Sequence, residues 1–456
     1  MPRFRFPHPV VLLGAAVVVA AILTWIVPAG QYDRRTDPVT GRQVVVPGTF
    51  HPTGRAPVGP FAAAVAIPRG FVAGADVIFL VLLVGGAWVV VDRLGTLPAV
   101  VGWLVDRFGD GGLLVIPIVA IFFGTMGALE NMLEEVIPLV PVLMVLGAGI
   151  GVDGITVVAM SLGAAMVGST FGPTNPFQAG IALKLAQLPP LGRGGLRLAT
   201  LIAGLTVWIV LTVVHARRFR RTGRRIHLPT DPHVRITAET AGEKRETMNA
   251  RHALILAIIV SPFAAYVYGA LRLDWGLNEL SGAFLIAGLL AGVVGGFGVT
   301  KTVTTYLDGM MSLLTAACMV GIARSISLVL DDGRVVDTIL HALVTPLARF
   351  PSFVAVLLMM PFQALLHIPV PSVSGQAVLT MPLFAPIADL LGFSREAVVI
   401  AYQIGAGLME MVTPTNGALM AVLLAAGVPL QRWLRFAAVG IVLLVTIGVV
   451  AAALAM

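Results

Sequence analysis

Long apolar runs recur along the whole chain, and they restrict the fold more than any other feature of the sequence. Residues 9 to 28, PVVLLGAAVVVAAILTWIVP, reach the roughly 20 residues that a helix needs to cross about 30 Å of hydrocarbon. Hydrophobic residues make up 57% of the chain and charged residues 12%, which is far from a soluble composition. The sequence predicts an all-α integral membrane protein with about nine spans, at 9 to 28, 77 to 91, 154 to 189, 196 to 216, 252 to 271, 280 to 297, 314 to 330, 394 to 428 and 434 to 455.

The positive charge of the chain is concentrated in one place. The net charge is +7, and the run RRFRRTGRR at 217 to 225 directly follows an apolar helix. Because lysine and arginine gather at the cytoplasmic ends of spans, we interpret 217 to 251 as a basic cytoplasmic linker and expect no nucleic-acid partner. The single cysteine, Cys318, excludes an internal disulfide and any multi-cysteine metal or iron–sulfur site, so we expect no cofactor.

The tripeptide Pro-Thr-Asn occurs twice, each time inside an apolar run. It lies at 173 to 175 and at 414 to 416, an offset of 414 − 173 = 241. At the same offset Pro382 falls on Pro141, and Gly392 falls on Gly151. An internal duplication explains these matches, with one copy in 1 to 216 and the other in 252 to 456.

Two further apolar segments each contain a polar or proline-rich turn, ALENMLEEV within 112 to 149 and HIPVPSVSGQ within 351 to 391. If each were one crossing, the linker would lie opposite Arg3 and Arg5 at the N-terminus, against the positive-inside tendency. Two re-entrant hairpins place the N-terminus and the linker in the cytoplasm, make the copies inverted, and leave 29 to 73 as a long outer segment. Amphipathic segments precede the hairpins and predict surface helices, with ordinary connectors as the alternative, at 97 to 108 and 335 to 350.

The two tripeptides interrupt the predicted helices at 154 to 189 and 394 to 428. A proline inside a span frees backbone groups, which membrane proteins tolerate only where protein or a water-filled cavity satisfies them. The ends of half-helices carry partial charges that suit an anion and a cation. Inverted repeats with broken helices are typical of secondary transporters, so we predict that the two breaks form one binding site. Two simple proline kinks are the alternative.

Polar residues gather at the predicted depth of this site. Charged groups at mid-membrane cost roughly 2.5 to 3.5 kcal/mol each on insertion scales, so they indicate a partner or a function. The first copy contributes Glu130, Asn131, Glu134, Glu135, Ser169, Thr170, Thr174, Asn175 and Gln178, and the second contributes Ser372, Ser374, Gly375, Gln376, Gln403, Glu410, Thr413, Thr415 and Asn416.

Three basic residues within apolar runs have separate interpretations. Arg324 would neutralise a glutamate at the tip of the first predicted hairpin, or it would bind a substrate carboxylate with its planar guanidinium group. The sequence leaves both roles open. Lys184 is interpreted as reaching the outer interface. His367 is interpreted as a hydrogen-bonding residue rather than a titrating one.

The coupling ion is the least determined feature. Hydroxyl, amide and carbonyl oxygens are hard ligands that suit Na⁺, whereas glutamates would carry H⁺. Both ions are open, and the carboxylate-poor breaks favour Na⁺. The candidate Na⁺ ligands are Glu130, Asn131, Ser169, Thr170, Thr174, Ser374, Thr413 and Thr415.

Five stretches are similar to one known family: LEEVIPLVPVL, GSTFGPTNPFQAGIA, GIARSISLVL, IPVPSVSGQAVLTMPLFAPIADLLG and EMVTPTNGALMAVL. Together they resemble the YfcC-like branch of the C4-dicarboxylate anaerobic carrier (DcuC) family, within the ion transporter superfamily, over nearly the whole chain. Related branches carry Ser-Asn-Thr at the hairpin tips. Here the first tip is acidic and the second is serine-rich.

The resemblance implies an elevator-type transporter of the inner membrane, a homodimer with a fixed scaffold domain and a mobile transport domain that holds both hairpins and both broken helices. Members of this branch are described as carboxylate carriers or as basic amino acid antiporters, and the tip glutamates suit a substrate with an amino group. Carried over by position, the implied substrate-binding residues are Asn131, Glu134, Glu135, Thr174, Asn175, Ser372, Ser374, Gly375, Thr415 and Asn416.

Three classes of function were compared. The sequence favours an ion-coupled secondary transporter of a small carboxylate or amino acid, with a small-molecule substrate and the lipid bilayer as its partners. An intramembrane enzyme would need a nucleophile and base or a metal triad, and the sequence contains no HExxH, GxSxG or paired-aspartate motif, so we expect no enzyme. A channel would use the same polar lining, but duplicated hairpins favour alternating access.

Overall fold

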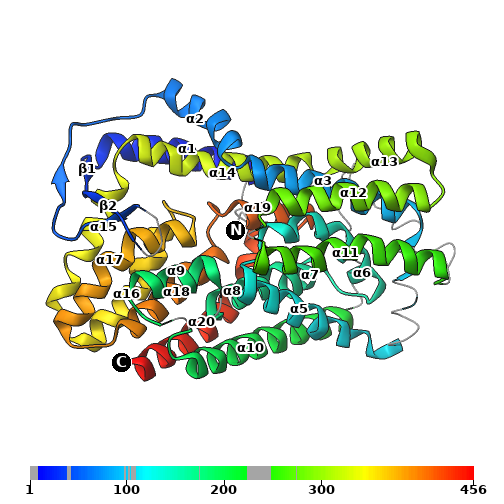
Figure 1. The fold of residues 1–456 in the computed structure, drawn as a ribbon. Helices are drawn as coiled ribbons and strands as arrows, with labels where there is room; N and C mark the ends of the chain where they lie inside the picture. Colours follow the sequence, from blue (N-terminus) through cyan, green and yellow to red (C-terminus); the bar gives the residue numbers. More distant parts are fainter. Residues whose placement is uncertain are drawn as a thin grey trace.

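The computed structural model is predominantly helical (Figure 1). It describes residues 9–38, 43–96, 99–100, 103, 109–173, 175–189, 191–222, 248–273 and 275–456. Three predicted features lie largely or wholly outside these described residues: Thr174, the surface helix at 97 to 108, and most of the basic linker.

The first half of the described chain contains α1 (Pro9–Ile26), α2 (Pro60–Ala73), α3 (Ala75–Arg93), α5 (Val115–Glu130), α6 (Val140–Gly149), α7 (Gly154–Val158), α8 (Ala164–Phe171), α9 (Ile181–Leu185) and α10 (Gly194–Arg221). The second contains α11 (Ala250–Arg272), α12 (Leu277–Val294), α13 (Gly298–Ser312), α14 (Leu314–Asp332), α15 (Val336–Val344), α16 (Ser352–His367), α17 (Val373–Leu391), α18 (Arg395–Glu410), α19 (Gly417–Ala425) and α20 (Leu430–Ala455). Short 3₁₀ or π turns lie at Gly109–Leu114, Glu134–Leu139, Ala159–Gly163, Pro176–Gly180 and Leu347–Arg349.

Eight helices in the described residues are long and apolar enough to cross a membrane: Ala75–Arg93, Gly112–Leu129, Gly154–Phe171, Gly194–Arg221, Leu277–Val294, Leu314–Asp332, Val373–Leu391 and Leu430–Ala455. This confirms a helical membrane protein. Two of the eight, Gly112–Leu129 and Val373–Leu391, fall in the segments that the sequence assigns to hairpins, whereas α1 and α11 belong to the shorter apolar helices. The number of spans and the re-entrant hairpins therefore remain predictions.

The helices form two layers (Figure 1). In one layer α3 packs on α12 and α13, and α14 packs on α1 and α2. In the other α5 packs on α8, α16 packs on α18, and α10 packs on α20. The layers meet where α3 contacts the 3₁₀ helix Glu134–Leu139 and where α14 contacts α19. This junction carries the site described below.

The segment 29 to 73 was expected to be one long outer loop, and that expectation was wrong for its last part. Residues 60–73, PFAAAVAIPRGFVA, form α2, which packs on α14. Pro68 and Gly70 lie inside this helix, and both residue types disfavour a helix interior, so the sequence did not predict it. Gly70 permits a backbone contact, since a Cβ there would lie 2.4 Å from the Gly321 carbonyl oxygen. Helix α13 was also missed, because its TKTVTTYLDG sequence is too polar to read as a span.

The segment before α2 folds against α15. Strand β1 (Gly30–Gln31) pairs with β4 (His51–Pro52), and β2 (Arg34–Thr36) pairs with β3 (Gln43–Val45), both antiparallel. The Tyr32 backbone N–H donates to Asp337 Oδ2 over 3.0 Å, and the Tyr32 hydroxyl lies 2.9 Å from His341 Nδ1. Burial, together with the Asp337 carboxylate, raises the pKa of Tyr32 to about 12, so this hydroxyl stays protonated. Helix α15 confirms a helix within 335 to 350.

Both Pro-Thr-Asn segments interrupt their helices, as predicted. The first helix ends at Phe171 and resumes at Pro176 as a π turn, and the second ends at Glu410 and resumes at Gly417. A proline has no backbone N–H to donate to the carbonyl oxygen four residues earlier, so the row of helical hydrogen bonds is interrupted at each place.

Glycines allow α5 and α8 to touch through their backbones. A Cβ at Gly127 would lie 2.0 Å from the Ala165 carbonyl oxygen, and a Cβ at Gly168 would lie 1.9 Å from the Gly124 carbonyl oxygen. Small residues drive helix association in membranes because lipid tails leave little hydrophobic driving force between helices. The α5–α8 contact supports the first break, which directly follows α8.

We expect Gly127→Ala and Gly168→Ala each to destabilise the protein by about 1 to 3 kcal/mol, because overpacking forces the two backbones apart. Thermal unfolding in detergent would measure the loss as a lower melting temperature. The matched control is Gly282→Ala in α12, where a Cβ meets nothing within 4 Å. Equal melting temperatures for Gly127→Ala and Gly282→Ala would contradict this account.

Candidate functional site

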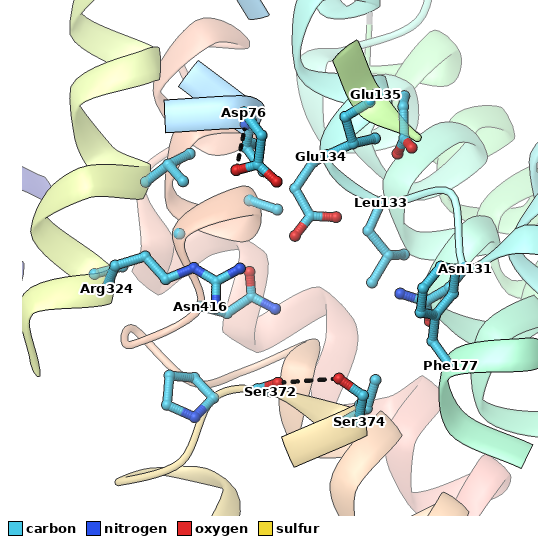
Figure 2. A pocket seen from close by; sticks show the side chains of 18 of the residues that line it. Asp76, Asn131, Leu133, Glu134, Glu135, Phe177, Arg324, Ser372, Ser374 and Asn416 are labelled. Carbon is cyan, nitrogen blue, oxygen red and sulfur yellow. Dashed lines mark hydrogen bonds between the residues drawn. The ribbon is translucent and has the colours of Figure 1, made fainter. Parts of the chain in front are cut away.

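A pocket of about 420 Å³ lies at the junction of the two layers (Figure 2). This volume falls within the range of small-molecule sites. One wall comes from α3, α14 and the α11–α12 turn. The other comes from both helix breaks and from the turns that follow α5 and α16, which correspond to the predicted hairpin tips and are called tips below. The polar and aromatic lining residues are Asp76, Asn131, Glu134, Glu135, Phe177, Tyr266, Trp275, Arg324, Ser327, Ser372, Ser374, Glu410, Thr415 and Asn416.

Asn131 joins the first tip to the first break. It ends α5 in the left-handed conformation, φ 58°, which asparagine adopts more readily than most residues. Its side-chain Oδ1 accepts hydrogen bonds from Ser169 Oγ at 2.5 Å and Asn175 Nδ2 at 3.0 Å. Asn175, fully buried, uses its own Oδ1 to accept from the backbone N–H groups of Phe177 and Gln178, at 2.9 and 3.1 Å.

In the second half, side chains cap two helices that begin at the pocket. Ser372 Oγ accepts from the Gly375 N–H at 3.2 Å and begins α17, and Asn416 Oδ1 accepts from the Leu419 N–H at 2.9 Å and begins α19. The N-terminus of a helix carries roughly half a positive charge, so both starts favour an anionic group in the pocket. Thr413 and Thr415 share a hydrogen bond of 2.7 Å beside the second cap.

Ionisable side chains of both signs line the pocket. Four are acidic, namely Asp76, Glu134, Glu135 and Glu410, and one is basic, namely Arg324. Arg324 extends from α14 toward Asn416, and the Glu134 carboxylate faces the same space (Figure 2). The salt bridges between described residues do not include Arg324, and its positive charge acts on Glu134 across the pocket, so both roles predicted for Arg324 stay open.

Side chains from other helices satisfy carbonyl groups next to the breaks, and at the first break the side chain comes from the opposite half. Gln403 Nε2 donates to the carbonyl oxygens of Thr170 and Gly172 at 3.1 and 3.2 Å. The Gln403 carbonyl oxygen in turn accepts from Gln178 Nε2 at 3.2 Å. At the second break the Met411 carbonyl oxygen accepts from Trp433 Nε1 at 2.7 Å. The breaks are therefore built into the fold rather than strained.

A buried ion pair fixes the position of Gln403. Arg197 donates to Glu396 Oε1 at 3.2 Å and also to Gln403 Oε1, and Arg197 and Glu396 are 2% and 4% exposed. A pair this deep requires hydrogen bonds on its remaining groups, and Gln403 supplies one of them.

The structure places the predicted site residues in three groups. Those that line the pocket are Asn131, Glu134, Glu135, Arg324, Ser372, Ser374, Thr415 and Asn416. Those in the layer behind it or beside it are Ser169, Thr170, Asn175, Gly375 and Thr413. The Glu130 side chain and Thr174 lie outside the described residues, Lys184 is exposed, and His367 is buried with a hydrogen bond to Gln376.

Five of the polar and aromatic lining residues were not predicted from the sequence: Asp76, Phe177, Tyr266, Trp275 and Ser327. Asp76 lies in the first turn of α3, where an acidic residue is normally explained by the helix dipole alone. Tyr266 and Trp275 flank a turn that the sequence marks only as a connector. No local pattern would have assigned them to the pocket.

A polar pocket between two apolar helical layers, walled by interrupted helices, defines a membrane transport protein. A protein-family comparison agrees with this class. Residues 6–456 match the family model of the C4-dicarboxylate anaerobic carrier, DcuC, and the chain belongs to this family.

Two curated relatives cover nearly the whole chain. YfcC of Escherichia coli (strain K12), provisionally named a basic amino acid antiporter, is 27% identical over 96% of this chain and 93% of its own length. A protein of Haemophilus influenzae (strain ATCC 51907 / DSM 11121 / KW20 / Rd), of unassigned function, is 25% identical over 95% of this chain and 93% of its own.

Among solved structures, the YdaH transporter of Alcanivorax borkumensis gives a TM-score of 0.43 and 16% identity over 98% of both chains. MtrF of Neisseria gonorrhoeae, described within a class of antimetabolite efflux pumps, gives a TM-score of 0.42 and 15% identity, covering 98% of this chain and 95% of its own.

We expect Asn175→Ala and Asn416→Ala each to lower uptake into proteoliposomes about tenfold or more, because each removes a capping hydrogen bond that orients a pocket wall, and 1.4 kcal/mol is worth a factor of ten. The matched control is Asn249→Ala, which removes the cap of α11 on the His252 N–H, at 2.9 Å, outside the pocket. All three should lose about 1 kcal/mol of stability, and only the first two should lose uptake. Unaltered uptake by both would contradict the shared site.

Proposed function

We propose that the protein is a secondary active transporter that binds an amino acid with a cationic side chain in this pocket and carries it across the cytoplasmic membrane by an elevator movement. One observation supports this most directly. A single pocket combines one guanidinium group and two capped helix N-termini with four acidic side chains. A carboxylate at one end and a positive charge at the other match this arrangement.

The carboxylate end of the substrate would lie near Arg324. Its planar fork binds a carboxylate through two parallel hydrogen bonds. The N-termini of α17 and α19 add partial positive charge on the same side, through Ser372 and Asn416.

The cationic end would face the acidic residues. Asp76 comes from the first layer, and Glu134, Glu135 and Glu410 come from the second. A C4-dicarboxylate would bring two negative charges among these four groups, which like-charge repulsion opposes. The same arrangement agrees with the basic amino acid antiporter named for the Escherichia coli relative.

The two layers suit the scaffold and the transport domain of an elevator. The hairpin tips and the breaks all belong to one layer, and the pocket lies where that layer contacts the other. Matching helices start at similar offsets in the two copies, 314 − 75 = 239 for α3 and α14, 352 − 115 = 237 for α5 and α16, and 430 − 194 = 236 for α10 and α20. These offsets support the duplication into 1 to 216 and 252 to 456. The inversion, the homodimer and the cytoplasmic linker remain predictions.

We propose Na⁺ as the coupling ion, which the sequence predicts from candidate ligands in both halves. In the first half two of these candidates, Asn131 and Ser169, place oxygens next to Asn175, and Gln178 Oε1 lies beside them. Melting temperature in detergent should rise with NaCl and stay constant with KCl, because a ligand that binds only the folded state stabilises it by mass action. Equal shifts with both salts would argue against a Na⁺ site.

The substrate is tested by counterflow in proteoliposomes. Unlabelled lysine or arginine inside the vesicles should drive accumulation of labelled lysine, and succinate inside should not. Arg324→Ala should weaken lysine binding about tenfold or more, because it removes a charge-assisted contact to the carboxylate. Cadaverine, which lacks the carboxylate, should bind wild type and Arg324→Ala equally.

Arg69→Ala is the control, since Arg69 pairs with Asp332 outside the pocket. Counterflow driven by succinate and not by lysine would reject a cationic amino acid as the substrate. Equal loss of lysine and cadaverine binding in Arg324→Ala would reject the carboxylate role of Arg324.

A further inference from the structure

Glu410 and His367 form a buried pair beside the pocket. Glu410, at the end of α18, lines the pocket and is 5% exposed, and His367, at the end of α16, is fully buried behind it. His367 Nε2 lies 3.7 Å from Glu410 Oε1. Neither the substrate carboxylate nor the Na⁺ prediction uses this pair.

Hydrogen bonds place a hydrogen on His367 Nδ1, the ring nitrogen that lies away from Glu410. Gln376 Nε2 lies 2.7 Å from the Gln363 carbonyl oxygen and 2.6 Å from Gln363 Oε1. A carbonyl oxygen only accepts, so the amide nitrogen of Gln376 must face it, and the amide oxygen must face His367. Gln376 Oε1 lies 2.8 Å from His367 Nδ1, so Nδ1 carries a hydrogen and donates it.

This assignment leaves His367 Nε2 directed at the carboxylate of Glu410. If both groups were deprotonated, a lone pair would face a buried negative charge with no donor between them, which is unfavourable. One proton removes the conflict, either on Glu410 as a neutral acid or on His367 as a cation. Without a cation beside Glu410, one proton on the pair is therefore favoured.

We propose that the Glu410–His367 pair is a proton-binding site, and that the cationic group of the substrate displaces its proton, so that the protein exchanges a proton for a cationic amino acid. The inference rests on the proposed function and adds the ion that moves in the opposite direction. A cation beside Glu410 and a proton on the pair neutralise the same carboxylate, so each lowers the affinity for the other. Charge balances, because one positive charge enters the pocket as one leaves.

The charged groups around the pair agree with this competition. Glu134 faces Glu410 from the 3₁₀ helix Glu134–Leu139, Asp76 comes from α3, and Arg324 comes from α14. Tyr402, about two helix turns before Glu410, donates its hydroxyl hydrogen to the Val373 carbonyl oxygen at 2.5 Å and is therefore occupied. The surrounding acidic groups favour a positive charge at Glu410, either a proton or the substrate.

The two halves differ at the position of Glu410, and this difference restricts the proposed proton site to the second half. At the offset of 241, Glu410 falls on Ser169. Ser169 donates to Asn131 at the first tip and remains neutral at any pH. The second half has a titratable side chain in the same position, with a histidine from α16 beside it.

The test uses vesicles that contain the full-length protein and an internal pH-sensitive dye. Lysine added outside should make the interior more alkaline, and labelled-lysine counterflow in the same vesicles should report transport. In Glu410→Gln the amide donates permanently to His367 Nε2 and cannot exchange a proton, so alkalinisation should fall to the rate of protein-free vesicles. The control is Asp389→Asn, which removes an exposed carboxylate paired with Arg395 and should retain alkalinisation.

The outcomes separate the two proposals. Lysine counterflow without proton movement in wild type would overturn the proton site and leave the proposed function standing. Lysine-driven alkalinisation in Glu410→Gln would overturn the assignment to this pair. Absence of lysine counterflow would overturn the proposed function and this inference with it.

A second measurement covers the case in which Glu410→Gln does not fold. Calorimetric titration of lysine into detergent-solubilised wild type, in two buffers with different ionisation enthalpies, gives the number of protons released. We expect about one proton per lysine bound, because binding and proton release are linked. A value of zero would overturn the proposal.

Discussion

The structure depends on the hydrogen bonds that Gln403 makes to the first broken helix. An interrupted helix inside a membrane has carbonyl groups that lipid cannot satisfy, each at a cost of several kcal/mol. Gln403 Nε2 satisfies two of them, on Thr170 and Gly172, and its own carbonyl oxygen accepts from Gln178. Arg197 holds the Gln403 side chain from α10, with Glu396 as its counter-ion. A side chain of the second half therefore satisfies backbone groups at the break of the first half, which links the two halves at the site.

The ends of the broken helices form part of the pocket wall, and the hydrogen bonds at the breaks hold these ends in place. Asn175, Ser372 and Asn416 cap the segments that begin there, and each cap fixes the direction in which backbone N–H groups point. The tips supply the remaining groups, through Asn131 on one side and Ser374 on the other. A site formed this way combines capped helix N-termini and Arg324 with four acidic side chains, the arrangement on which the proposed substrate with one carboxylate and one cationic group depends.

Much of this arrangement could be predicted from the sequence, because proline and asparagine act locally. Pro173 and Pro414 interrupt their helices wherever the rest of the chain lies, so both breaks were predictable. On the opposite wall Arg324 was predicted, but Asp76, Tyr266 and Trp275 were not. Asp76, Tyr266 and Trp275 reach the site only through the packing of α3, α11 and α12, and α2 was missed because Pro68 and Gly70 resemble a loop. A residue whose role comes from its contacts rather than its local pattern leaves little signal in one sequence.

The two halves share a framework and differ in chemistry, and the difference lies where each broken helix meets a tip. In the first half a neutral network of Asn131, Ser169 and Asn175 closes on itself. In the second half Glu410 occupies the position of Ser169 and meets His367, so the same framework holds an ionisable pair. In the proposed transporter, two copies of this framework would supply the symmetry that alternating access requires. The proposed proton site then depends on one difference between the halves, a carboxylate at Glu410 where the first half has the hydroxyl of Ser169.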